Sequence, residues 1–332
     1  MSAMESITKN RQTPDALRAM IARAYGPDLV PAGEDFAAEL GHGWFNVAYR
    51  IRLRDGRDTV LKVAPPPGVA VMTYERDAMA IELAALALVR ERTTVPVPAV
   101  DFADTALDLC DAPYFFMPYI DADNLGVVRE DLPEAEVAAY WEAIGALNAE
   151  LNAITGPGFG PLLDPRHATW RAAFAEIVAD VLADGERRAV DIGFDYATVR
   201  EVFAAHASSL DEVAEPRFVE WDLWPSNVMV KDGAVVCVID HERALWGDPL
   251  FEAGFCGVEV PVFGDSDAFL RGYGRAGLTG TERVRRRLYG LHLLLVMTIE
   301  TVYRGHTDPG QYDWARAQLA DLMARFGHRP RP

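Results

Sequence analysis

The sequence predicts an α+β protein in which a small lobe with an antiparallel β-sheet precedes a larger, mainly helical lobe. Three observations lead to this fold class. Residues 46–64 form two alternating runs around Asp55-Gly56, which is a strong β-hairpin signal. Residues 121–133 are polar and rich in turn residues, and most of the chain after them has helical periodicity. The length of 332 residues fits two lobes of about 150 residues each.

The first third of the chain is expected to form one sheet that carries one long helix. We predict helices over residues 14–25 and 75–92, and strands over 36–40, 46–53, 58–64, 99–103 and 113–120. The proline-rich run at 95–100 ends the second helix, because proline cannot continue a helix. We assign residues 1–120 to the N-terminal lobe, 121–332 to the C-terminal lobe, and a hinge to 116–121.

The second part of the chain is expected to be helical, with one short hairpin and a cleft between it and the first lobe. The predicted helices are 134–152, 168–185, 195–207, 264–274, 281–304 and 311–326. The hairpin joins residues 228–230 to 234–239 through Lys231-Asp232-Gly233.

Composition excludes several classes of protein. A formal net charge of −18 disfavours nucleic acid and anionic membranes as partners and would attract a cationic small substrate. The longest strongly apolar stretch, residues 288–299, is shorter than the ~20 residues that span a bilayer. The three cysteines are far apart and odd in number, so no disulfide framework or CxxC metal site is expected. Without a recognisable signal peptide, we expect a cytoplasmic protein; the sequence does not predict its oligomeric state.

Three oxygen-bearing side chains are expected to meet at the open end of the second hairpin. Asp222 and Asn227 are five residues apart on the loop before it, and Asp240 ends its second strand. Because a tight hairpin folds back on itself, Asn227 and Asp240 should lie close together, with Asp222 on the loop just before them. Mg²⁺ prefers such hard oxygen ligands. Asp-x₄-Asn followed by a strand-terminal Asp is also the spacing of a kinase catalytic loop and metal-binding Asp.

The stretch DLWPSNVMV…VIDHERALWGDPLFE resembles the aminoglycoside phosphotransferase and choline-kinase-like family. The resemblance covers residues 35–330 and implies a protein-kinase-like two-lobed fold. It also implies transfer of a phosphate from ATP, or in some members GTP, to a hydroxyl of a small molecule. Asp222 would be the catalytic base, and Asn227 and Asp240 would hold Mg²⁺.

The N-terminal third contains a lysine suited to nucleotide phosphates. Only three of the 32 basic residues are lysine, and Lys62 stands at the end of a predicted strand in an apolar run. The compact ammonium of lysine offers a point charge that arginine does not reproduce. The resemblance places the family's nucleotide lysine at Lys62 and its helix partner at Glu82, with Glu75 as the alternative. Each of the three could otherwise be an ordinary surface charge.

Two further segments are assigned through the resemblance. Gly41-His42-Gly43 would let backbone N–H groups approach phosphate, with Asn46 at the family's Asn position. YFFMPYID resembles the family's hinge: Met117 would back the adenine, and the Pro118 carbonyl and Ile120 amide would read its edge. Taken alone, these segments read as a β-turn and a buried strand.

The chain departs from the family pattern at two positions. Glu220 stands where most members have histidine, and His241 replaces an aromatic residue. We expect His241 to be a packing replacement. Glu220 should point to solvent or pair with an arginine such as Arg217 or Arg243; the alternative is an inward carboxylate that repels Asp222 and Asp240.

The sequence therefore predicts an ATP- and Mg²⁺-dependent small-molecule kinase. Its acceptor would be an antibiotic, an aminocyclitol, an amino alcohol or a sugar. The alternative is a catalytically impaired kinase-fold protein that binds a nucleotide or ligand, which Glu220 motivates.

Overall fold

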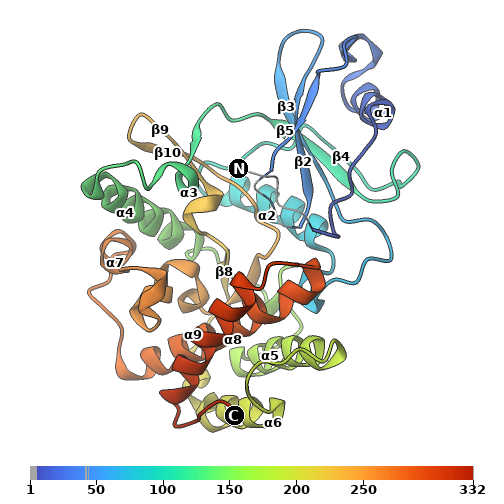
Figure 1. Cartoon of the computed structure of the whole chain (residues 1–332). Helices are drawn as coiled ribbons and strands as arrows, with labels where there is room; N and C mark the ends of the chain where they lie inside the picture. Colours follow the sequence, from blue (N-terminus) through green and yellow to red (C-terminus); the bar gives the residue numbers. More distant parts are fainter. Residues whose placement is uncertain (1–5, 42, 44, 332) are drawn as a thin grey trace. The chain divides into compact units, whose positions relative to one another are not determined.

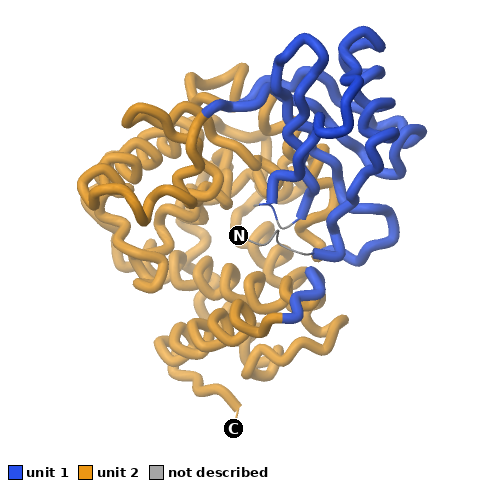
Figure 2. Tube along the Cα trace, turned by 45° about the horizontal axis from the view of Figure 1, so that its top comes forward, with its two compact units in different colours: residues 1–71, 98–121, 303–307 blue, residues 72–97, 122–302, 308–332 orange. Residues whose placement is uncertain are grey.

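The structure is a computed structural model that describes residues 6–41, 43 and 45–331 (Figure 1). Its contacts divide the chain into two units (Figure 2). Unit 1 comprises residues 1–71, 98–121 and 303–307, and unit 2 comprises 72–97, 122–302 and 308–332. Within the described residues, no helix is long and apolar enough to cross a membrane.

Unit 1 is built on a five-stranded antiparallel sheet with strand order β1-β2-β3-β5-β4 (Figure 1). The strands are β1 (Ala37–Glu39), β2 (Val47–Arg52), β3 (Asp58–Val63), β4 (Phe102–Asp104) and β5 (Tyr114–Pro118). The hairpin predicted around Asp55-Gly56 joins β2 to β3, and Gly56 takes a φ of +90° that side chains rarely adopt. Ile51, Leu61 and Phe115 are fully buried and form part of the core of this sheet.

Helix α1 (Pro14–Tyr25) also belongs to unit 1. Thr13 caps it by accepting a hydrogen bond from the Ala16 N–H, and Pro14 starts it without losing a backbone bond. Its buried residues Leu17, Met20 and Ile21 follow the spacing of a single helix face.

Unit 2 contains most of the described helices, and they lie close to where the periodicity predicts them, except that the short helix Leu125–Val128 falls in the segment predicted to be polar and rich in turns. They are α2 (Ala78–Arg92), α3 (Leu125–Val128), α4 (Glu134–Leu151), α5 (Trp170–Arg187), α6 (Tyr196–His206), α7 (Asp267–Tyr273), α8 (Gly280–Arg304), whose end reaches unit 1, and α9 (Gly310–Ala324). Short 3₁₀ turns connect elements of both units: η1 (Pro27–Leu29), η2 (Thr73–Glu75), η3 (Ala207–Glu212), η4 (Pro225–Asn227), η5 (Pro249–Phe251), η6 (Ala253–Val258) and η7 (Pro261–Phe263).

Two small sheets frame the central loop of unit 2. The predicted hairpin forms from β9 (Val228–Lys231) and β10 (Ala234–Val238), and β6 (Asp123–Asn124) pairs with β9. The second sheet joins β7 (Gly160–Pro161), β11 (Leu245–Gly247) and β8 (Arg217–Val219). Sequence analysis does not predict this second sheet, because strands of two or three residues are too short to show an alternating pattern.

The division into units differs from the predicted boundary in two segments. One stretch of unit 1 ends at residue 121, while residues 72–97 with α2 belong to unit 2 and residues 303–307 to unit 1. Side-chain and backbone contacts explain the first difference. Thr73 donates from its N–H and hydroxyl to Asp184, and the Val238 N–H donates to the Pro96 carbonyl. The nucleotide and acceptor roles of the two lobes stay predictions.

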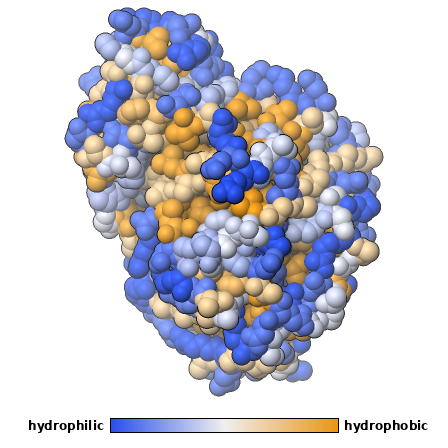
Figure 3. Space-filling model, turned by 180° about the vertical axis from the view of Figure 1, so that it is seen from behind, coloured by the Kyte–Doolittle hydropathy of each residue, from blue (hydrophilic) through white to orange (hydrophobic). Residues whose placement is uncertain are grey.

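Exposed apolar side chains are dispersed along the described chain. Figure 3 shows one face on which hydrophobic residues gather around the middle and hydrophilic residues form much of the rim. The large exposed apolar residues come from separate elements: Ile7, Leu107, Val127, Leu163, Val262 and Val302.

Candidate active site

The loop between β8 and β9 brings Asp222 and Asn227 together. The Asn227 side-chain N–H₂ donates to the Asp222 carbonyl at 2.7 Å and lies 3.4 Å from its Oδ2. The Ile239 N–H donates to the Asn227 carbonyl at 2.9 Å, so the end of the hairpin is tied to the same loop. Asp240 follows directly, and its charge acts on Asp222. The loop thus holds Asn227 against Asp222, and the hairpin ties the segment that leads into Asp240 to the same loop.

The environment of Asp222 favours a proton acceptor near neutral pH. Burial raises the pKa of Asp222 to about 6; Arg243 opposes the shift, while Asp240, Glu300 and Glu220 add to it. Arg243 Nη1 lies 3.4 Å from Asp222 Oδ1. From the sequence, Arg243 is expected only as a partner for Glu220, although it stands three residues after Asp240 and so close to the same site.

The acid limb of the activity should report this carboxyl. We expect kcat/KM to fall about tenfold per pH unit below about pH 6, because a protonated Asp222 cannot accept a proton. R243M should move the inflection to higher pH, since it removes the cation that lowers this pKa. A pH–rate profile measures both effects, and a flat profile down to pH 5 would contradict the assignment.

Asp240 lies in a cluster of carboxylates that fits a divalent cation. One carboxylate oxygen each from Glu82, Asp240 and Glu242 lies within 4.8 Å of the others. Hard oxygen donors at this density are the ligands that Mg²⁺ prefers. The amide nitrogen of Asn227 donates its hydrogen bond to Asp222. The amide oxygen is therefore the atom suited to bind a cation. Sequence analysis assigns Glu82 as a lysine partner and does not assign Glu242.

The expectation for Glu220 is wrong. Its side chain is only 1% exposed, and its Oε2 lies 2.9 Å from His241 Nδ1. Burial alone would lower the pKa of His241, but the Glu220 carboxylate raises it, so the net shift is upward. His241 is fully buried, as a packing residue would be, but it also carries this ion pair. The inward carboxylate is therefore compensated by a neighbour that the sequence analysis treats only as packing.

Glu252 holds the start of the loop between β8 and β9, a role that no sequence pattern indicates. Its two carboxylate oxygens accept the backbone N–H groups of Glu220 at 2.9 Å and Trp221 at 3.0 Å, and Asn152 donates to Oε1 at 2.9 Å. Burial raises the pKa of Glu252 to about 7, against the hydrogen bonds from Asn152 and Glu220. Trp221 has a φ of +63°, so these bonds stabilise a backbone conformation that residues other than glycine seldom adopt.

Exchange of Glu252 for glutamine should destabilise the protein. E252Q keeps the shape but replaces one accepting oxygen by an N–H₂ group, which leaves a buried backbone donor unpaired. We expect a loss of about 1–3 kcal/mol in the free energy of unfolding, measured in urea. The exposed Glu201 on α6 provides the control E201Q, which should change stability by less than about 0.5 kcal/mol. Equal stabilities of the two variants would contradict the role of Glu252.

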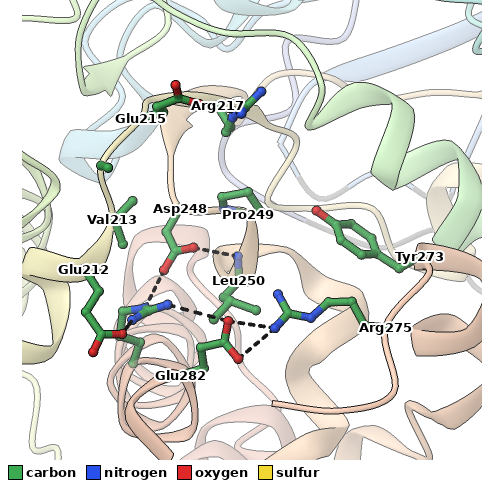
Figure 4. Close-up of a pocket in the computed structure, with 12 residues that line it drawn as sticks. Glu212, Val213, Glu215, Arg217, Asp248, Pro249, Leu250, Tyr273, Arg275 and Glu282 are labelled. Atoms are coloured by element: carbon green, nitrogen blue, oxygen red, sulfur yellow. Dashed lines mark hydrogen bonds and ion pairs between the residues drawn. The ribbon is translucent and has the colours of Figure 1, made fainter. Parts of the chain in front are cut away.

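A polar cavity in unit 2 lies around Asp248, near β8 and β11. It measures about 410 Å³ and is lined by charged residues of both signs from several elements (Figure 4). Asp248 accepts bonds from the Leu250 N–H, Arg285 Nε and the Tyr289 hydroxyl. None of the sequence-predicted site residues lines this cavity, and Asp248 acts there as a structural residue.

The predicted phosphate turn lies in unit 1. Gly41, Gly43 and Asn46 fall between β1 and β2, while His42 lies outside the described residues. Lys62 is 8% exposed and is the second-last residue of β3, where Ala48 and Phe115 flank it on the neighbouring strands. The turn and the lysine are thus one hairpin apart, as the sequence suggests.

The hinge residues end β5, which lies between β3 and β4 in the unit 1 sheet. Met117 and Pro118 are the last residues of β5, and Ile120 follows it. The Thr59 hydroxyl donates to the Met117 carbonyl at 2.8 Å, which fixes this strand end. Glu75, the alternative to Glu82, accepts the Met72 N–H at 2.8 Å and closes its own 3₁₀ turn.

Residues 37–289 match the model of the phosphotransferase enzyme family (APH), which is more than half of the chain. The chain belongs to this family. Hygromycin-B 4-O-kinase of Escherichia coli is 28% identical over 221 residues, which cover 61% of this chain and 60% of that relative.

Two solved structures share the fold. A thermostable mutant of aminoglycoside phosphotransferase APH(4)-Ia aligns with a TM-score of 0.68 at 20% identity, over 93% of this chain and 99% of that one. A putative fructosamine-3-kinase from Thermobifida fusca aligns with a TM-score of 0.63 at 25% identity, over 93% and 99%. These likenesses confirm the predicted α+β, protein-kinase-like fold class.

Proposed function

We propose that this phosphotransferase family member transfers the γ-phosphate of ATP to a hydroxyl of a small molecule. The observation that carries the proposal is the convergence of Asp222 and Asn227 beside Asp240 on one loop and hairpin. This is the residue set that phosphoryl transfer needs: a proton acceptor for the nucleophile and oxygen ligands for the metal. A relative, APH(4)-Ia, has been solved with AMP-PNP and hygromycin B.

Each predicted residue has a defined task in this proposal. Asp222 orients the acceptor hydroxyl and accepts its proton as the oxygen attacks phosphorus. Asn227 and Asp240 hold Mg²⁺, which when bound neutralises charge on the phosphate oxygens. Positioning and charge stabilisation, rather than covalent chemistry, supply most of the catalysis in such reactions.

The remaining predicted residues hold the nucleotide. Lys62 and the backbone of Gly41 and Gly43 bind the phosphates, with Asn46 supporting the turn. Met117 backs the adenine, and the Pro118 carbonyl and Ile120 amide read its edge. The carboxylate of Glu82, assigned as the partner of Lys62, also has Asp240 and Glu242 beside it.

The proposed acceptor is a hydroxylated molecule that carries amines. The net charge of −18 favours cationic ligands, and named relatives act on hygromycin B or have been solved with gentamicin. Aminoglycoside antibiotics, aminocyclitols and amino alcohols have this chemistry, and a neutral sugar is the contrasting class. An antibiotic acceptor would make the protein a resistance enzyme.

An ATP-consumption screen with Mg²⁺ tests the proposal. The panel contains hygromycin B, gentamicin, aminocyclitols, amino alcohols and neutral sugars, each with ATP and with GTP. We expect acceptor-dependent ADP release with at least one amine-bearing compound and none with D222N. Measurable ATP binding without turnover on any acceptor would favour the impaired binding protein instead.

A further inference from the structure

Glu220 and His241 connect the two backbone segments that carry the proposed base and the proposed metal ligand. Glu220 stands two residues before Asp222, and His241 directly follows Asp240. Both side chains are buried, at 1% and 0% exposure, with 2.9 Å between Glu220 Oε2 and His241 Nδ1. The pair lies entirely within unit 2.

The two segments joined by this pair both contain a strained residue. Trp221 and Asp240 have φ angles of +63° and +71°, although neither is glycine. Such conformations persist only where the surroundings fix them. Glu252 fixes the first segment through the backbone N–H groups of residues 220 and 221.

The other ring nitrogen of His241 contacts the backbone that precedes Asp240. Nε2 lies 3.1 Å from the Val238 carbonyl at the end of β10, two residues before Asp240. The ring therefore spans from the Glu220 carboxylate to the backbone that leads into Asp240. Glu220 is at the same time anchored to Glu252 by its own N–H.

We propose that Glu220 and His241 form a brace that positions Asp240 relative to Asp222. Here the imidazole comes from the position after the metal-binding Asp, whereas the residue pattern that the chain resembles has histidine two residues before the base. Glu220 and His241 are positioning residues that act through Asp222 and Asp240. The inference rests on the proposed function, because it assumes that Asp240 binds the metal of the nucleotide.

The brace predicts different effects for single and double substitutions of Glu220 and His241. E220H places two imidazoles against each other, and H241F leaves a buried carboxylate without its partner, so each single change should disturb Asp240. The double variant E220H/H241F places an imidazole at 220 and an aromatic ring at 241, which is the usual pattern of the family. E220Q is the conservative variant, because its amide offers either partner to Nδ1: the oxygen accepts from a protonated ring, and the N–H₂ group donates to a neutral one.

Calorimetric titration of AMP-PNP, with Mg²⁺ and with EDTA, is the decisive experiment. We expect E220H and H241F each to weaken Mg²⁺-dependent AMP-PNP binding tenfold or more. E220Q and the double variant should stay within threefold of the wild type. AMP-PNP binding in EDTA should be unchanged in all variants, since the nucleotide contacts made without metal do not involve this pair.

A purely structural pair would give a different pattern. Thermal unfolding measured on the same samples shows which variants are folded at the titration temperature. Folded single variants with unchanged Mg²⁺ dependence, or a double variant weaker than both singles, would overturn the brace. If either single variant does not fold, E220Q and the double variant provide the test. A tenfold loss of Mg²⁺-dependent AMP-PNP affinity in both would overturn the brace. Wild-type AMP-PNP binding that is independent of Mg²⁺ would instead overturn the proposed function itself.

Discussion

The variant D222N is expected to lose turnover by about 10²–10⁴-fold while its affinity for Mg·ATP changes by less than about threefold. Asparagine keeps the size of the side chain but cannot accept a proton from the acceptor hydroxyl. The bond from Asn227 to the backbone carbonyl of residue 222, at 2.7 Å, does not depend on the carboxylate and should survive. The loop that carries the proposed metal ligands therefore stays in place.

Steady-state kinetics and calorimetry separate the two effects. The loss should appear in kcat, because Asp222 is proposed to act on the attacking hydroxyl rather than on the nucleotide. Because Asp222 is not a proposed metal ligand, its charge attracts Mg²⁺ only from a longer distance, so the loss of metal affinity should stay small. Wild-type turnover in D222N would exclude Asp222 as the base, and a large loss of nucleotide affinity would show that it serves the metal.

The sequence could predict those parts of the site that one hairpin brings together. Asn227 and the segment that leads into Asp240 lie together because β9 and β10 fold back on each other, and a two-strand pattern with a turn is visible in the sequence. Lys62 and the glycine turn follow from the β2–β3 hairpin in the same way. Local chain geometry is sufficient in both cases.

Contacts made by tertiary packing were not predictable from these patterns. Glu252 meets the loop at 220–221 through a bond across some thirty residues, and Glu220 meets His241 across twenty-one. A lone glutamate is by default a surface charge, so the sequence analysis placed Glu220 in solvent or beside an arginine. The two departures from the family pattern were treated separately, whereas the structure shows that they compensate each other.

Substitution of Asp240 should abolish Mg²⁺-dependent ATP binding. We expect D240A and D240N to weaken it by at least about 100-fold, which corresponds to about 2.7 kcal/mol. Asp240 has a φ of +71°, a conformation that asparagine tolerates better than alanine. D240N therefore isolates the lost charge, and the additional instability of D240A reports the backbone strain.

The neighbouring carboxylates provide the matched comparison. Because oxygens of Glu82 and Glu242 lie within 4.8 Å of the Asp240 oxygen, either could hold the cation in its place. If Asp240 is the principal ligand, E242Q should weaken Mg²⁺-dependent ATP binding much less than D240N does, when both are measured by calorimetry at several Mg²⁺ concentrations. If D240N still binds Mg·ATP normally and E242Q does not, Glu242 is the principal metal ligand. Asp240 would then have no role in the proposed mechanism.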